Sequence, residues 1–193
     1  MTSLNVEAYP TTPPKVCIKP EASTISCLSS VSTLFIESEE DKSYSSEYFN
    51  TFDTMATRFM DLLHPSVENS STCVPLVVRC LRLLSSCRYD ESDISSVLAV
   101  TVIHHNTLMS RLRTVLSDKE RSFIIVSQIY IAHTIVLDEC CVLSNWHKHL
   151  FSSYCDLHCL RRAVARILKR MDYTLFVHPD RVTDLANSIL NFS

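Results

Sequence analysis

The sequence predicts an all-α protein, and three observations support that fold class. The 193-residue chain contains no glycine, whereas tight β-hairpins and bulges usually need glycine at positive φ angles. Apolar residues recur at helical spacing through most of the chain after residue 73. Residues 123–137 are apolar almost all round, and such a helix must lie at the centre of a bundle or in a membrane.

Three segments are expected along the chain. Residues 1–50 are rich in Ser and Thr, carry an acidic run from Glu37 to Asp41 and show little periodicity, which predicts a disordered leader. Residues 51–72 are expected to form an N-terminal helix and a linker, because the apolar pattern stops at His64-Pro65. Residues 73–193 are expected to form the compact domain with a C-terminal helix.

The compact domain is expected to contain five helices and one more after them. The first runs from about residue 73 with Pro75 in its first turn, and Asp90 or Ser92 can cap the second. Ser117 and Glu120 form a capping box at the start of the third.

A short fourth helix is expected around Trp146 to Phe151. Asp156 can cap the fifth, and the last passes through residues 182–190 after the break at His178-Pro179-Asp180.

The third helix is expected in the core and not in a membrane. Its apolar run, Phe123 to Leu137, has 15 residues, whereas a membrane span needs about 20. It also carries Gln128, Tyr130 and His133. We therefore expect no membrane partner.

Composition excludes several classes of function. Without glycine, the chain cannot form a P-loop, a dinucleotide-binding fingerprint or a glycine-hinged catalytic turn. The net charge is −3, and the basic run from Arg161 to Arg170 falls opposite an apolar stripe, as on a solvated helix face. We expect no nucleic-acid partner, no cofactor and no enzymatic activity.

The nine cysteines indicate reduced thiols and not a metal centre. No signal peptide is visible after Met1, so we expect an intracellular protein of the nucleus, the cytoplasm or both. Cysteine and histidine are dense between Cys140 and Cys159, but no C-x₂-C spacing of a zinc site occurs there.

The helix order and several segments resemble the cyclin box, and most closely the single-box Pcl type of fungi and the P/U type of plants. Ile131 to Glu139 resembles the end of the third cyclin helix, and Ser144-Asn145-Trp146 resembles the Ser-Asn…Trp that follows it, with shorter spacing. Val97 to His105 resembles the second helix, and Leu160 to Val177 the fifth helix and its exit. The resemblance covers about residues 73 to 190. It implies a five-helix cyclin box with one flanking helix on each side.

The sequence departs from the family at the residues that contact the kinase. Cyclins generally carry a Lys at the end of the third helix and a Glu in the fifth. The Lys position falls on Ile135, or on Thr134 with a one-residue slip, and the Glu position falls on Val164. An apolar pair can replace a buried ion pair at little cost or with a gain in stability, so the fold can persist. The Asp-Arg of the second helix is also missing, with His104-His105 nearby.

The resemblance implies a regulatory subunit that binds and activates a cyclin-dependent kinase. The alternative is a degenerate cyclin-fold adaptor that no longer activates a kinase. The kinase-facing residues are expected at the end of the third helix and on the fifth: Phe123, Ile135, Asp138, Glu139, Arg161, Val164 and Leu168.

Overall fold

The computed structural model describes residues 46–63, 73–112, 115–137 and 141–191. Every regular element within these ranges is a helix, which confirms the all-α fold class. The leader predicted over residues 1–50 lies outside the described residues except for its last five, which are helical. The elements are α1 (Ser46–Leu63), α2 (Cys73–Ser86), α3 (Glu91–Arg111), α4 (Asp118–Val136), α5 (Leu143–Trp146), the π-helical turn η2 (His147–Phe151), α6 (Leu157–Arg170) and α7 (Pro179–Leu190).

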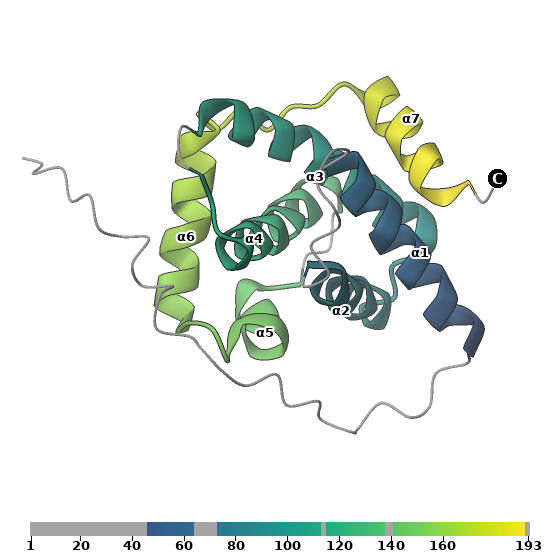
Figure 1. Ribbon diagram of the computed structural model, residues 1–193, viewed down its shortest axis with the longest axis horizontal. Coiled ribbons are helices and arrows are strands. Elements are labelled where there is room, and N and C mark those ends of the chain that lie inside the picture. The colour runs from purple at the N-terminus through teal and green to yellow at the C-terminus, as the bar shows by residue number, and fades with distance from the viewer. Residues whose placement is uncertain (1–45, 64–72, 113–114, 138–140, 192–193) are drawn as a thin grey trace, which may run out of the picture.

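Helix α4 is the central element. Between Ser122 and His133 only Ile124 and Tyr130 are not fully buried, and both are half-buried. Helices α2, α3 and α6 pack against it, and Figure 1 shows it enclosed by α2, α3, α5 and α6. The apolar run predicted a core helix, and the structure confirms it. No helix in the described part of the chain combines the length and apolar character that a membrane crossing requires.

The helix starts follow local capping chemistry. The Ser117 hydroxyl accepts from the backbone N–H of Glu120, and the Glu120 carboxylate accepts from the backbone N–H of Ser117. Asp156 caps α6 in the same way through the N–H of Cys159 at 2.7 Å. Of the two caps considered for α3, the structure selects Asp90, which accepts from the N–H of Asp93 at 2.8 Å.

Helix α1 belongs to the core and is more than a flanking helix with a linker. It begins at Ser46, and Met55, Ala56 and Phe59 have no exposed surface. It packs on α2, α3 and α7, because its apolar face covers the side of α2 and α3 turned away from α4. The Arg58 guanidinium donates to the carbonyls of Ile189 and Asn191 and so ties α1 to the end of α7.

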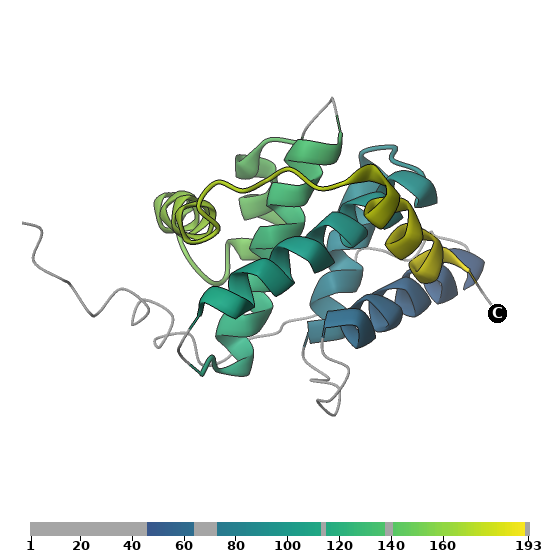
Figure 2. The ribbon, with the colours of Figure 1, turned by 90° about the horizontal axis from the view of Figure 1, so that it is seen from above.

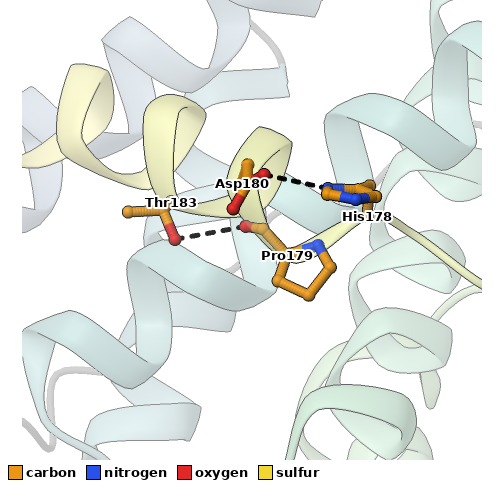
Figure 3. Close-up of polar contacts among 4 residues, drawn as sticks. All are labelled: His178, Pro179, Asp180 and Thr183. Carbon is orange, nitrogen blue, oxygen red and sulfur yellow. Dashed lines mark hydrogen bonds and ion pairs between the residues drawn. The ribbon is translucent and has the colours of Figure 1, made fainter.

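The chain reaches α7 by an extended segment that crosses the molecule. Figure 2 shows the stretch after α6 passing over the bundle to α7, which packs on α3 and α1. The start of α7 is held locally (Figure 3): Thr183 donates to the Pro179 carbonyl at 3.1 Å, and His178 lies 3.4 Å from the Asp180 carboxylate. Both members of that last pair are largely exposed, so the pair contributes little to stability.

Two helices end in left-handed residues other than glycine. Arg88 follows α2 with φ 69°, and Asp172 and Tyr173 follow α6 with φ 57° and 52°. The N–H of Tyr89 bonds the Leu84 carbonyl, as in a Schellman ending. Since the chain has no glycine, residues with a side chain must occupy these positions.

We predict that Arg88→Gly stabilises the protein. A left-handed residue with a Cβ costs about 1–2 kcal/mol, and the greater freedom of glycine in the unfolded chain offsets part of the gain. We expect the free energy of unfolding to rise by about 0.5–1 kcal/mol in urea titrations. Arg88→Ala, which keeps the Cβ, is the control and should lie close to wild type; equal stability of the two variants would contradict the explanation.

Candidate partner-binding surface

The candidate surface combines the last turn of α4 with the outer side of α6, and the two helices pack against each other through other residues. A second apolar cluster holds them together: Ile131 from α4 lies with Ile167 and Met171 from the α6 end and Leu108 from α3. All four side chains are at most 8% exposed. The relative placement of the α4 end and α6 therefore depends on buried contacts.

Ile135 is an exposed apolar residue at the end of α4. It is 40% exposed, although Ile131 one turn earlier is buried. Thr134 beside it is also exposed, whereas Val136 and Leu137 are half-buried. Asp138 and Glu139, which were predicted to share this surface, lie outside the described residues.

The α6 residues of the predicted surface differ in how much of each side chain is exposed. Val164 and Leu168 are half-buried and pack on the second apolar cluster, while Arg161 is exposed. Ile135 and Val164 were expected to form a buried apolar pair in place of the family's ion pair. In this chain Ile135 is exposed and Val164 is only half-buried, so the two do not form a fully buried pair. The physical reason is that Ile135 lies beyond the part of α4 that its neighbours cover.

The outer face of α6 is strongly basic. Its first turn contains no acidic residue, and no Asp or Glu occurs within the helix. The basic side chains all lie on the exposed face, as the sequence pattern predicted: Arg161, Arg162, Arg166, Lys169 and Arg170. The face can therefore attract an acidic partner surface by long-range electrostatics.

Phe123 lies in the core and not on the surface. It is 9% exposed, and its ring meets that of Phe151 edge-on, with 5.2 Å between ring centroids. The reason is its position in the first part of α4, where η2 covers it. Any contact of Phe123 with a partner would require its packing against Phe151 to change.

Three buried histidines on α3 and α4 were not singled out as core residues by the sequence pattern. His105 Nδ1 lies 2.7 Å from the Gln128 amide oxygen, and His104 Nε2 donates to the Leu175 carbonyl at 3.3 Å. Burial lowers the pKa of His104 below its usual 6.5, and its hydrogen bond to Leu175 partly opposes this. The signal that could have found His104 is its spacing from Val97 and Thr101, which lie on the same buried face of α3.

His133 is enclosed by three aromatic rings near the end of α4. The ring centroids of Tyr89, Tyr130 and Trp146 lie 5.5, 6.4 and 5.6 Å from that of His133. Its Nε2 accepts from the backbone N–H of Cys141 at 3.4 Å, and the Tyr89 hydroxyl is also 3.4 Å away. Burial lowers the pKa of His133 below its usual 6.5, which favours the neutral form of the ring.

The cysteines and histidines around η2 serve as hydrogen-bonding and packing groups. His147 Nε2 donates to the Cys155 carbonyl at 2.7 Å, and burial with the neighbouring Cys159 and Asp156 raises the pKa of the Cys155 thiol to about 11. Within the described ranges, no three His, Cys, Asp or Glu side chains are grouped so that they could hold a metal ion.

Comparison with known proteins found no related family or structure. A scan against family models gave no match, and searches of curated proteins and of solved structures gave none either. The assignment of function therefore depends on the residues and geometry of this chain.

We predict that acid destabilises the fold through His104 and His133. Their pKa values are lowered in the folded state, so below about pH 6.5 the unfolded chain binds protons that the folded chain does not. Stability should be full above pH 7.5 and fall as the pH drops through 6.5, by up to about 1.4 kcal/mol per pH unit for each histidine. The measurement is urea unfolding at several pH values.

The controls for this pH dependence are single substitutions. His104→Gln and His133→Gln should each reduce the slope of stability against pH, whereas His149→Gln on the surface should leave it unchanged. A slope that is the same in all three variants would contradict the assignment.

We predict that Phe123→Ala lowers stability by about 3 kcal/mol, because the truncation leaves a cavity against Phe151. Phe176 is 85% exposed, so Phe176→Ala is the matched control and should change stability by less than about 0.5 kcal/mol. Thermal unfolding followed by circular dichroism measures both. A loss of less than about 1 kcal/mol for Phe123→Ala would argue against its core position.

Proposed function

We propose that this protein is a cyclin-like regulatory subunit that binds a cyclin-dependent protein kinase and shifts it toward its active arrangement. The proposed contact is the end of α4 together with the outer side of α6. Such a subunit performs no chemistry. It binds one conformation of the kinase better than the other and so changes their populations.

The observation that carries the proposal is the exposed end of an otherwise enclosed helix. Helix α4 is buried from Ser122 to His133 apart from two half-buried residues, and it then presents Ile135 at 40% exposure. An exposed apolar side chain on a rigidly held helix end can serve as an anchor residue in a protein interface. The order of helices around α4 and the segments that resemble the cyclin box support a kinase as the partner.

The α6 side of the proposed contact adds charge to this apolar anchor. Arg161 is exposed next to the half-buried Val164 and Leu168, so a small apolar strip has a basic border. Interfaces commonly combine an apolar centre with a polar rim, and complementary charge raises the association rate. The proposed kinase surface is therefore apolar at its centre and acidic on the side that meets α6.

A second candidate function is a cyclin-fold adaptor that does not activate a kinase. The observation that favours it is that this sequence has Ile135 where cyclins generally carry a Lys and Val164 where they generally carry a Glu. These are the positions where the family resemblance places the kinase-contacting ion pair. An adaptor would use the same surface for a different protein partner.

We predict that tagged protein purified from its native cells recovers a proline-directed kinase in stoichiometric amount. Ile135→Asp should reduce that recovery at least about tenfold, which corresponds to about 1.4 kcal/mol. Val115, in the connection before α4, is 99% exposed, and Val115→Asp is the matched control that should bind as wild type. Repeated recovery of another stoichiometric partner without a kinase would overturn the proposal.

The double variant Ile135→Lys with Val164→Glu separates the two candidate functions. If the wild-type chain recovers no kinase and the double variant gains one, the adaptor function is supported. Because Val164 is half-buried, the melting temperature of the double variant must be measured alongside, so that a folding defect is not mistaken for lost binding.

A further inference from the structure

The outermost side of α6 carries a row of basic residues that is distinct from the proposed kinase contact. Arg162, Arg166 and Lys169 follow one another at spacings of four and three residues, so they form one row along the helix. The row lies opposite the buried Leu160 and Ile167. The α6 residues assigned to the kinase contact lie on a flank of the helix instead.

The charge of α6 is opposite to that of the rest of the chain. The helix holds five of the 18 Lys and Arg residues and none of the 21 Asp and Glu residues, which leaves 13 basic and 21 acidic residues elsewhere, a net charge of −8. Among the described residues, no carboxylate forms an ion pair with Arg162 or Lys169. Arg111 of α3 adds a further cation, because its guanidinium donates to the Arg170 carbonyl at 3.2 Å. A short acidic segment fits this face better than a nucleic acid or an anionic membrane, since the acidic remainder of the chain would repel an extended polyanion.

Two exposed aromatic side chains follow the end of α6. Tyr173 and Phe176 are 64% and 85% exposed. Their backbone is held in place, because the Tyr173 N–H donates to the Leu168 carbonyl at 3.0 Å and His104 Nε2 donates to the Leu175 carbonyl at 3.3 Å. The chain therefore presents an apolar contact area directly after the basic row, and such an exposed area is typical of an interaction site.

A segment of the chain outside the described residues has the complementary chemistry. Residues 37–41, Glu-Ser-Glu-Glu-Asp, contain four acids, and no other stretch of five residues in the sequence contains as many. The three residues directly before them, Leu34-Phe35-Ile36, are apolar. If this segment runs antiparallel to α6, its acids meet the basic row and its apolar triplet meets the exposed aromatic residues.

The acidic segment is too close to the start of α1 to reach α6 of its own chain. Helix α1 begins at Ser46, five residues after Asp41, and five residues span at most about 18 Å. Figure 1 places α6 and the start of α1 at opposite ends of the bundle. A compact domain of this size is roughly 35 Å across. The α6 that the segment can reach therefore belongs to another molecule.

We propose that residues 34–41 of one copy of this chain dock on the basic row and the exposed aromatic residues of α6 in a second copy. Each copy offers one acidic segment and one basic face, so the contact is head-to-tail and can extend beyond a dimer. Exposed ion pairs are individually weak and are screened by salt, so the association depends on protein concentration and is reversed by salt. It does not depend on the proposed kinase contact, because both partners are copies of this chain.

The test measures the mass of the purified full chain by sedimentation velocity, with a reducing agent present, at several protein concentrations. One chain has a mass of 22.0 kDa. The average mass should rise above this value with concentration in about 0.05 M salt and return to it in about 0.5 M salt. Phe176→Ala removes apolar area and no charge, and it should weaken the association about tenfold or more.

Two neutralised variants identify the two halves of the contact. The first, Arg162→Gln with Lys169→Gln, loses the basic row and keeps the acidic segment. The second keeps the basic row and loses the acids: Glu37→Gln, Glu39→Gln, Glu40→Gln and Asp41→Asn. Each variant by itself should associate at least about tenfold more weakly than wild type.

Mixing the two neutralised variants is the decisive measurement. The mixture contains one intact acidic segment and one intact basic row per pair, so it should form a complex of twice the single-chain mass and no larger. Arg181→Gln, which removes an exposed cation on α7, is the matched control and should associate as wild type does. Circular dichroism of every variant checks that the helical fold is retained.

Four results would each overturn the proposal. They are a wild-type chain that is monomeric at every concentration in low salt, a neutralised variant that associates as tightly as wild type, a mixture that stays monomeric, and Phe176→Ala that associates as tightly as wild type.

Discussion

The burial of α4 is the constraint on which the rest of the structure depends. An apolar helix with no solvent face needs covering on all sides, and α2, α3, α5 and α6 provide that cover (Figure 1). An unpaired buried polar group is costly, and hydrogen bonds offset that cost for some of the polar atoms that α4 carries inward, although the Ser127 hydroxyl and the Gln128 amide nitrogen have no partner among the described residues. Gln128 meets His105 on α3, and His133 meets Cys141 and Tyr89.

The lack of glycine determines which residues occupy the left-handed positions at the helix ends of this bundle. Helix ends that would ordinarily use glycine use Arg88, Asp172 and Tyr173 in the left-handed region. Each such residue costs stability, so the turn persists only because the helices around it are packed.

Helix α6 has two roles that its two faces separate. Its inner face, with Leu160 and Ile167 buried, joins the main core to the second apolar cluster. Its outer face is basic and exposed, and the helix packs against α4, whose last turn exposes Ile135. A surface built on two mutually packed helices is rigid, and rigidity lowers the ordering cost of binding a partner. This is the physical basis for choosing it as the partner surface.

The sequence by itself determined the all-α fold class, the central position of α4 and the starts of α4 and α6, whereas it left Asp90 and Ser92 as alternative caps for α3. These features depend on composition, on helical spacing and on caps such as Ser117 with Glu120, which involve residues close together in the chain. Only the tertiary structure decided that α1 joins the core, that Phe123 is buried while Ile135 is exposed, and that His104 and His133 are core residues. Each of these depends on which distant helix covers a given position, and helical periodicity specifies a face without specifying the neighbour that packs on it.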